Sequence, residues 1–487
     1  MSGSEPEQQP EQQREQMSTD VVVLGGGPAG ENVAGRVRDG GLECVLVESE
    51  LYGGECSYWA CMPSKAMLRP VELAAAATRL PGVPTGPVDA QAVLKRRDWF
   101  TGYDGHRHDD SGQEKWVEGT GAVPMRGLAR LDGPRRVVVE RADGTRTAIE
   151  ARQAVVLAVG SDAAVPPVPG LLEAKPWTSR EATSAEHVPE RLVVLGGGVV
   201  ACEMAQAYRG LGSREVAIVE LADRLLGRTE PFAGEMIATA LRDAGVDVRV
   251  SAQVTRVERP QPGGEVTLTL ADGSTFTADE VLVATGRRPR TTDIGLESVG
   301  LEPGRTTPTD DWLRVQGVDG DWLYAVGDVN GRNLLTHMGK YQARLCGDVI
   351  VRRARGEEPG DGLRARGDTF GAPSVVFTDP QVGSVGHTEA EARAAGVPVR
   401  AVEYDIGSVA GASLLADGYR GRAKIVVDED RPVVVGATFV GQDVAELLHS
   451  ATVAVVGEVP LDTLWHAVPS YPTISEIWLR LLETYGL

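Results

Sequence analysis

The stretch DVVVLGGGPAGENVAGRVRDGGLECVLVESE, residues 20–50, decides the fold. Its apolar residues at 21–24 predict a buried parallel strand, a helical stretch follows, and CVLVE at 44–48 predicts the next strand. Gly25, Gly27 and Gly30 form the pattern G-x-G-x-x-G between the first strand and the helix, and Glu48 follows 23 positions after the first glycine. Strand, glycine turn, helix, strand and acidic residue together predict a dinucleotide-binding unit.

Each glycine of this unit has a separate task. Gly25 permits the tight turn, Gly27 lets the backbone approach a pyrophosphate, and Gly30 allows the helix to pack closely on the strand. The phosphates are expected at the positive end of the helix, and Glu48 is placed to accept hydrogen bonds from ribose hydroxyls.

A second unit of the same kind occupies residues 191–220, RLVVLGGGVVACEMAQAYRGLGSREVAIVE. It carries Gly196, Gly198 and Ala201, and Glu220 follows 24 positions after Gly196. Two units imply two dinucleotides, or one large cofactor and a diffusible nicotinamide. Glu220 favours NADH, because a carboxylate accepts from a free ribose 2′-hydroxyl and repels the extra phosphate of NADPH. Two arginines that follow closely soften this preference and leave NADPH possible; they are Arg224 and Arg228.

The order of the motifs predicts an α/β protein with two Rossmann-type dinucleotide-binding domains and a C-terminal α+β domain. Residues 1–18 are polar and rich in Gln, Glu and Pro, which predicts a disordered tail. Residues 19–165 and 288–366 are assigned to one discontinuous nucleotide domain, 166–287 to the second, and 367–487 to the α+β domain. Residues 95–119 are the least readable ordered segment, and the two histidines there, His106 and His108, are interpreted as part of a surface loop.

Charge and composition exclude several classes of partner. The net charge of −20 disfavours nucleic acid and anionic membranes. No apolar run approaches the roughly 18 residues needed to cross a bilayer, and the N-terminus does not resemble a secretory signal. Five cysteines in 487 residues are too few for an extracellular disulfide scaffold, so we predict a cytoplasmic protein.

Two of these cysteines stand close together in GGECSYWACMPSKAM, residues 53–67. Cys56 and Cys61 are separated by four residues, a spacing compatible with a metal clip, a structural staple or a redox couple. A zinc site needs more Cys or His ligands, and none lies nearby at a suitable spacing, so no metal is predicted. The residues from Met62 onward read as a helix, which places Cys61 at its start.

Taken together, the motifs resemble a known family. The order of the motifs resembles that of the flavoprotein pyridine nucleotide–disulfide oxidoreductases. The first nucleotide fingerprint is followed by the cysteine motif G-G-x-C-x-x-x-x-C-x-P-S-K, then by the second fingerprint, then by A-T-G-R-x-P and finally by G-D. That family includes dihydrolipoamide dehydrogenase, glutathione reductase, mercuric reductase and soluble transhydrogenase. The resemblance implies FAD in the first unit, NAD(P)H in the second, and a homodimer formed by the C-terminal domain, in which each tail completes the partner's active site.

The resemblance also implies roles for individual residues. Cys56 and Cys61 would form a redox-active disulfide, with Cys61 contacting the flavin and Cys56 exchanging with substrate. Lys65 would lie beside the hydride-accepting nitrogen of the flavin and pair with Glu203. The implied FAD-binding residues are Gly25, Gly27, Gly30, Glu48, Lys65, Ala129, Gly327 and Asp328, and the implied NAD-binding residues are Gly196, Gly198, Ala201, Glu220 and Gly286.

The C-terminal active-site motif departs from the family pattern. Disulfide reductases of this family end in H-P-T-x-S-E, where the histidine is the general base and the glutamate orients it. Here HAVPSYPTISEIW, residues 466–478, keeps Glu476 but has Tyr471 in the histidine's place. Phenols normally titrate near pH ~10, so Tyr471 is a poor proton relay at neutral pH, and His466 is a candidate substitute. A tyrosine at the position of Tyr471 resembles the pattern of mercuric reductase and soluble transhydrogenase. Trp59 resembles the tryptophan in the C-x-x-W motif of the transhydrogenases.

These observations predict an FAD-dependent NAD(P)H oxidoreductase with a redox-active disulfide, Cys56–Cys61, that passes electrons from NADH by way of FAD to a quinone or a small disulfide. A quinone could take the electrons directly from the flavin. Dihydrolipoamide dehydrogenase is one alternative, and a mercuric reductase-like or transhydrogenase-like enzyme is another. A redox-sensing flavoprotein with little turnover is an alternative from a different class.

Overall fold

The computed structural model describes residues 15–103 and 105–487. The chain divides into two compact units: unit 1 comprises residues 1–54, 109–162 and 288–365, and unit 2 comprises residues 55–108, 163–287 and 366–487. Of the predicted tail, residues 1–14 lie outside the described residues, and residues 15–18 begin the first strand.

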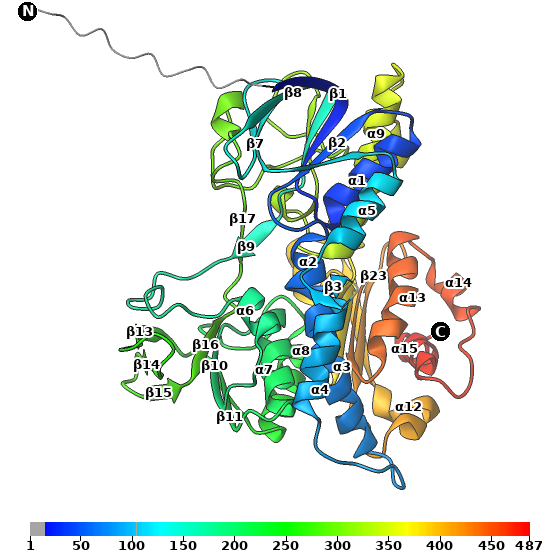
Figure 1. The fold of residues 1–487 in the computed structure, drawn as a ribbon. Coiled ribbons are helices and arrows are strands. Elements are labelled where there is room, and N and C mark those ends of the chain that lie inside the picture. Colours follow the sequence, from blue (N-terminus) through cyan, green and yellow to red (C-terminus); the bar gives the residue numbers. More distant parts are fainter. Residues whose placement is uncertain (1–14, 104) are drawn as a thin grey trace, which may run out of the picture. The chain divides into compact units, whose positions relative to one another are not determined.

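Unit 1 is built on a sheet of seven strands in the order β5-β2-β1-β8-β7-β6, with β18 also paired to β8 (Figure 1). The predicted strands at 21–24 and 44–48 pair in parallel, with Val21 opposite Cys44. The elements of unit 1 are β1 (Glu15–Leu24), α1 (Pro28–Asp39), β2 (Cys44–Glu48), α5 (Ser111–Gly119), β5 (Val123–Arg126), β6 (Leu128–Leu131), β7 (Arg136–Glu140), β8 (Arg146–Leu157), η1 (Leu296–Val299), β18 (Leu323–Ala325), η2 (Gly327–Asn330), α9 (Thr336–Ala354) and η3 (Asp361–Leu363).

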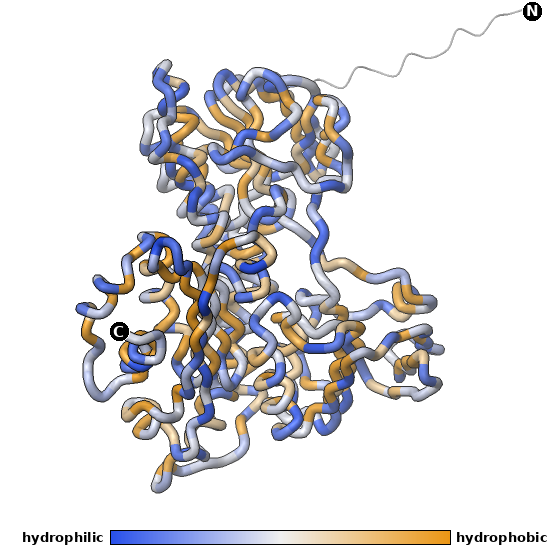
Figure 2. Tube along the Cα trace, turned by 180° about the vertical axis from the view of Figure 1, so that it is seen from behind, coloured by the Kyte–Doolittle hydropathy of each residue, from blue (hydrophilic) through white to orange (hydrophobic). Residues whose placement is uncertain are grey.

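The core of unit 1 lies on both faces of this sheet. Val21 and Val23 face one apolar cluster together with residues of α1 and α9, whereas Val22 and Leu24 face a second cluster with β6, β7 and β18. A strand buried on both faces reads as an unbroken apolar run, which is the pattern of residues 21–24. Figure 2 shows the same concentration of hydrophobic residues along the strands.

Unit 2 contains the second parallel sheet, in the order β12-β11-β10-β16, and a three-stranded antiparallel sheet, β13-β14-β15. Apolar residues of β10 and β11 pack against α3 (Cys61–Ala77), α7 and α8. The elements are α6 (Ser179–Ser184), β10 (Arg191–Leu195), α7 (Val199–Gly210), β11 (Glu215–Val219), α8 (Pro231–Asp243), β12 (Val246–Arg249), β13 (Val254–Glu258), β14 (Val266–Leu270), β15 (Thr275–Ala278) and β16 (Glu280–Val283).

Residues 95–119, the least readable segment of the sequence, are largely regular structure, and His106 lies in a short strand rather than in a loop. Helix α4 (Ala90–Phe100) is followed by a hairpin of β3 (Gly102–Tyr103) and β4 (His106–Arg107), and α5 begins at Ser111. The mixed polar composition hid these elements because their stability comes from tertiary contacts: Arg97, for example, is buried and donates to the carbonyl of Ala185 at 2.7 Å.

The C-terminal part of unit 2 is a five-stranded antiparallel sheet in the order β19-β20-β23-β22-β21, covered by α13 and α15, and the predicted α+β fold is confirmed. Across residues 15–103 and 105–487, no helix is both long and apolar enough to cross a membrane. The elements of the C-terminal part of unit 2 are α10 (Gly367–Phe370), β19 (Ser374–Val376), β20 (Gln381–Gly386), α11 (Glu389–Ala394), β21 (Val399–Asp405), η4 (Ile406–Ser408), α12 (Ala410–Leu415), β22 (Arg422–Asp428), β23 (Val433–Gly441), α13 (Val444–Val456), α14 (Leu461–Trp465), η5 (Ile474–Glu476) and α15 (Ile477–Tyr485).

Candidate functional site

The glycine turn between β1 and α1 is crowded on its inner side and open on its outer side. Gly25 has a φ of 102°, which L side chains rarely adopt. A Cβ at Gly30 would lie 1.9 Å from the carbonyl oxygen of Gly25, so α1 packs directly on the turn. A Cβ at Gly27 would come no closer than 3.9 Å to its neighbours, which leaves this backbone accessible. The first turn of α1 therefore presents peptide N–H groups to a ligand.

Glu48 closes the end of this turn. Its Oε2 accepts a hydrogen bond from the Gly26 N–H at 2.7 Å, and its Oε1 accepts from the Glu50 N–H at 2.7 Å. Burial raises the pKa of Glu48, while these two backbone donors act in the opposite direction. Gly127 donates its N–H to the Glu48 carbonyl at 3.0 Å, which brings the start of β6, and with it Ala129, to the same edge of the sheet.

Asp328 lies in η2, directly after β18, at the same edge of the unit 1 sheet. The Ser161 hydroxyl donates to Asp328 Oδ2 at 2.5 Å. The Gly327 N–H donates to Gln342 Oε1 at 2.7 Å and holds the turn that carries Asp328. Residues that the sequence places far apart are thus delivered to the carboxyl ends of neighbouring parallel strands, the place where α/β sheets bind ligands.

Glu31, the residue directly after Gly30, was not among the predicted site residues. Its side chain is buried, and its Oε1 has no hydrogen-bond partner within residues 15–103 and 105–487. Burial raises the pKa of Glu31 to about 7, Lys340 opposes that rise, and Glu48 adds to it. An unpartnered carboxyl oxygen beside this glycine turn can accept a hydrogen bond from a ligand held there. An acidic residue at this position, one after the third glycine, is the signal that would have found it.

The second turn, between β10 and α7, repeats the plan with a more open mouth. A Cβ at Gly196 would lie 2.5 Å from the carbonyl oxygen of Ala284, whereas one at Gly198 or Gly286 would meet nothing within 4 Å. Ala201 is fully buried where α7 packs on the sheet. Val199, at the first position of α7, is 38% exposed, so apolar surface borders the open backbone. These features fit a nicotinamide dinucleotide.

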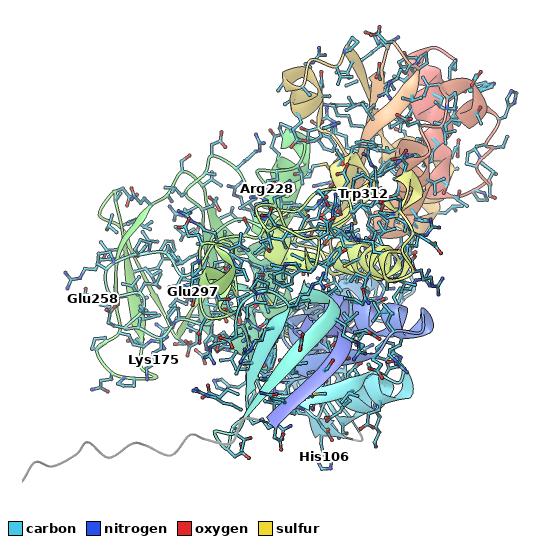
Figure 3. All side chains as sticks on the ribbon, turned by 90° about the horizontal axis from the view of Figure 1, so that it is seen from above. His106, Lys175, Arg228, Glu258, Glu297 and Trp312 are labelled. Atoms are coloured by element: carbon cyan, nitrogen blue, oxygen red, sulfur yellow. The ribbon has the colours of Figure 1, made fainter. Side chains whose placement is uncertain are left out.

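Glu220 lies after β11 at the edge of this second turn. Its Oε1 accepts from the Ala222 N–H at 2.6 Å. Arg224 turns toward its own loop, where it donates to the Gly227 carbonyl at 2.9 Å. Arg228 is exposed (labelled in Figure 3). The structure therefore engages one of the two arginines locally and leaves the other in solvent.

The two cysteines lie on consecutive helices. Cys56 belongs to the short helix α2 (Gly54–Tyr58), and Cys61 is the first residue of α3 (Cys61–Ala77). Ala60, with φ −135° and ψ −97°, interrupts the helical path between them. Both cysteines are half-buried. The predicted helix start at Cys61 is confirmed, and this position favours the negative charge of a thiolate.

Lys65 lies one turn after Cys61 on α3 and pairs with Glu203 of α7. The distance from Lys65 Nζ to Glu203 Oε2 is 2.7 Å, and the Glu203 side chain is only 4% exposed. Glu203 Oε1 accepts from the Phe377 N–H at 3.0 Å, and Lys65 Nζ lies 4.9 Å from the centre of the Phe377 ring. Both carboxylate oxygens are therefore occupied, which fixes the direction of the lysine.

An aromatic cluster surrounds the segment between the cysteines, and its contacts were not predicted. The Arg180 guanidinium lies 4.1 Å from the centre of the Trp59 ring and bonds Glu55 at 2.5 Å. The His108 ring contacts Trp59 edge-on at 5.4 Å. Burial, followed by nearby Arg107, lowers the pKa of His108. His106, two residues earlier, is exposed (Figure 3).

The predicted active-site residues near the C-terminus differ in how exposed their side chains are. Tyr471 is 76% exposed, and His466 is exposed as well. Glu476 is buried, and its Oε1 accepts from Arg480 at 2.7 Å. Glu476, the last residue of η5, is therefore engaged by Arg480 of the following helix α15.

Family models match most of the chain. The pyridine nucleotide-disulphide oxidoreductase model matches residues 19–343, and the dimerisation domain model of the same family matches residues 372–481. The chain belongs to this family. The predicted fold, FAD and NAD(P)H as cofactors, and an oxidoreductase activity are thereby confirmed.

Individual members cover nearly the whole chain. A dihydrolipoyl dehydrogenase of Haloferax volcanii is 30% identical over 480 residues, covering 96% of this chain and 96% of that protein. A mercuric reductase of Shigella flexneri is 31% identical over 474 residues, covering 96% of this chain and 80% of that protein. The solved structure of the HOCl-induced flavoprotein disulfide reductase RclA of Escherichia coli matches with a TM-score of 0.79 at 24% identity, over 95% of this chain and 99% of that chain.

Proposed function

We propose that this oxidoreductase has a redox-active Cys56–Cys61 pair and passes electrons from NADH, by way of FAD, to a quinone or a small disulfide. The observation that carries the proposal is the arrangement at α3: Cys61 begins the helix, and one turn later Lys65 is held by the buried Glu203 at 2.7 Å. FAD, when bound, supplies the two-electron relay between a nicotinamide and the cysteine pair.

The protein's own residues support the reduction of a disulfide. Breaking an S–S bond with two electrons releases a thiolate, which must be stabilised where it forms. The N-terminus of α3 favours that charge at Cys61, and Cys56 on α2 is the sulfur left to exchange with an acceptor. Glu203 holds Lys65 in one direction, because its two oxygens are fixed by the lysine and by the Phe377 N–H.

Tyr471 is the reason to include quinones among the acceptors. A dithiol or disulfide substrate needs a proton donor and acceptor, whereas a quinone can be reduced without an imidazole base at this position. Trp465, Val468 and Tyr471 form an exposed apolar stretch near the end of the dimerisation domain. This supports a homodimer in which the stretch is covered by the partner and contributes to its active site, with Tyr471, His466 or water handling the proton.

The remaining predictions belong to the same proposal. Glu220 and the local hydrogen bond of Arg224 support NADH as the preferred nicotinamide. The domain division at residues 165, 287 and 366 and the cytoplasmic location remain predictions.

Dihydrolipoamide dehydrogenase is the second candidate, because relatives of that activity align over almost the whole chain. A mercuric reductase-like or transhydrogenase-like enzyme is supported by Tyr471 and by the mercuric reductase relative. A sensor would be reduced once by NADH and then stall. Turnover measured with a panel of electron acceptors distinguishes each of these alternatives from a quinone reductase.

Anaerobic titration of the flavin-loaded protein with NADH tests the cysteine assignment. We expect a long-wavelength thiolate-to-flavin absorbance band that appears in wild type once two electrons have opened the disulfide, and that is absent from Cys61→Ser. In Cys56→Ser, which has no disulfide, the band should already be present before NADH is added, because only Cys61 is assigned to the flavin. Cys346→Ser, at a buried cysteine of unit 1, is the matched control and should behave as wild type. A band that survives in Cys61→Ser would refute the assignment.

A screen of acceptors then tests the substrate class. The panel contains menadione, lipoamide, oxidised glutathione and mercuric ion, each with NADH or NADPH as donor. We expect turnover with menadione in wild type, and a gain of about tenfold or more with lipoamide in Tyr471→His, since general acid–base catalysis contributes at least ~10²-fold in many enzymes. Rapid wild-type turnover of lipoamide would instead support dihydrolipoamide dehydrogenase.

A further inference from the structure

A lysine is buried near the start of β22, a strand of the five-stranded sheet. The side chain of Lys424 is only 8% exposed, and its Nζ lies 2.7 Å from a carboxylate oxygen of Glu389, 2.9 Å from Glu230 and 3.5 Å from Glu403. Burial lowers the pKa of Lys424, but the carboxylates of Glu389 and Glu230 outweigh that effect and raise the pKa above its ordinary value. Lys424 is therefore a buried cation that joins three acidic side chains.

The charges around Lys424 balance. Three cations and three carboxylates meet here: Lys424, Arg393, Arg422, Glu230, Glu389 and Glu403. Glu389 also pairs with Arg393, and Glu403 also pairs with Arg422. Glu230 is 4% exposed, and Lys424 is its one cationic partner among the residues that the structure describes. Loss of Lys424 would therefore leave Glu230 as a buried carboxylate without a cation, which is strongly unfavourable.

Glu230 ends a loop, residues 221–230, that runs between β11 and α8. This loop lies against the second glycine turn. The Leu226 N–H donates to the Gly197 carbonyl at 2.9 Å, and a Cβ at Gly197 would lie 2.8 Å from Cδ2 of Leu225. The shape of the turn therefore depends on the place of the loop.

The loop keeps a conformation that needs support from its surroundings. Leu226 is buried and has a φ of 49°, in the left-handed region that side chains other than glycine rarely adopt. A Cβ at Gly234, in the first turn of α8, would lie 2.2 Å from the Leu225 carbonyl oxygen, so the helix packs directly on the loop. Such strain persists only where neighbouring contacts hold it, and Glu230 fixes the end of the loop.

Helix α7 is anchored independently of this loop. Glu203 Oε1 accepts from the Phe377 N–H at 3.0 Å, and Gln206 Oε1 accepts from the Asp379 N–H at 2.7 Å. Glu203 also holds Lys65. A change confined to the loop should therefore alter the second glycine turn and leave Lys65 in place.

We propose that Lys424 is a positioning residue for the nicotinamide dinucleotide. By fixing Glu230, it holds residues 221–230 against the second glycine turn, although Lys424 itself belongs to the part of the chain matched by the dimerisation domain model. Without Lys424, the uncompensated Glu230 moves toward water and takes the loop away from Gly197. This role rests on the second turn as the nicotinamide site, and it does not depend on the electron acceptor.

Two variants break the link from opposite sides. Lys424→Met removes the cation, and Glu230→Ala removes the anchor of the loop while Lys424 keeps Glu389 and Glu403 as partners. The flavin-loaded, full-length proteins are reduced anaerobically in a stopped-flow instrument, with NADH and separately with NADPH. We expect the half-saturating dinucleotide concentration to rise about tenfold in both variants, with the limiting rate of flavin reduction within about twofold of wild type. Because no acceptor is present, the result is independent of the proposed quinone or disulfide.

A double variant and a matched control separate positioning from general damage. Lys424→Met combined with Glu230→Gln contains no uncompensated charge, and its amide oxygen can accept from the Glu389 N–H, so most of the affinity should return. Arg259→Met breaks another buried ion pair of unit 2, 2.7 Å from Glu280 at the start of β16. Ligands bind at the opposite, carboxyl end of such strands, so this control should lower Tm without raising the half-saturating concentration.

Hydrogen–deuterium exchange observes the loop without turnover. Amides of residues 221–230 should exchange about tenfold faster or more in Lys424→Met and Glu230→Ala, and near the wild-type rate in the double variant. An unchanged half-saturating concentration in Lys424→Met or in Glu230→Ala would overturn the proposal. So would an equal rise in Arg259→Met, or wild-type exchange of the loop in Glu230→Ala.

Discussion

The two glycine turns share the same sequence pattern, but the residues around them differ. In the first, Glu48 is held by two backbone N–H groups, and a buried carboxyl group, Glu31, follows the third glycine. In the second, Glu220 accepts from Ala222, a buried cysteine occupies the position of Glu31, and exposed Val199 borders the mouth. We propose that the first turn encloses a cofactor and that the second admits one that exchanges.

Gly30→Val should give the largest effect, because it breaks the first turn while the second already tolerates a side chain there. The added Cβ would lie 1.9 Å from the Gly25 carbonyl oxygen, so α1 has to move off the turn. We expect loss of nearly all bound flavin, measured by absorbance after purification, and a reduced Tm. Ala201→Gly, at the equivalent position of the second turn, is the control and should retain its flavin. A flavin-replete Gly30→Val protein would show that the first turn is not the flavin site.

Glu31→Gln should sharpen the comparison through pH. The pKa of Glu31 is raised to about 7 by burial, above the 4.5 of an exposed glutamate. The folded state therefore binds the proton more tightly, and the contribution of this residue to stability falls as pH rises from about 4.5 to 7. Above that window the charged glutamate costs up to about 3 kcal/mol, which the amide avoids.

Urea unfolding at pH 8 and pH 5, at matched flavin content, measures this effect. We expect Glu31→Gln to be more stable than wild type at pH 8 and close to it at pH 5. A variant that is less stable than wild type at pH 8 would contradict the raised pKa.

Glu220→Arg should give the smallest effect of the three and act only on the second turn. Replacing the carboxylate by a guanidinium removes the acceptor for a ribose 2′-hydroxyl and attracts a 2′-phosphate. We expect the ratio of kcat/KM for NADH to that for NADPH to fall by about tenfold or more, with flavin content unchanged. Arg228→Gln, at the exposed arginine nearby, is the control. An unaltered ratio in Glu220→Arg would place nicotinamide selectivity elsewhere.

The sequence predicted the nucleotide units well because their signals are local. The apolar run at 21–24 and the strand at 44–48 lie where they were expected, and α3 begins at Cys61 as predicted. Such elements are encoded within a few residues by the spacing of apolar side chains and by residues, such as glycine, that end a strand or helix. The pairing of Lys65 with Glu203 came from the family resemblance, since 138 positions separate the two residues and no local pattern joins them.

Other features depend on contacts between distant segments and escaped prediction. The helices on either side of the hairpin at 102–107 have no strong apolar period, and the contacts of His108 with the rings of Tyr58 and Trp59 join segments that are distant in sequence. Glu31 looked like an ordinary helix residue until its burial was known, and Lys424 looked like an ordinary strand residue until its three carboxylate partners were known.

Helix α7 has a practical consequence for protein engineering. It is 12 residues, about 18 Å, long, and it borders the second glycine turn at one end, carries Glu203 and Gln206 in its middle, and meets α3 at the other end. There a methyl group on Gly210 would lie 2.2 Å from Val71. A chimera that takes its nicotinamide-binding segment from a relative must therefore also take that relative's α3 and residues 377–380. Crossover points that separate these segments will displace Lys65.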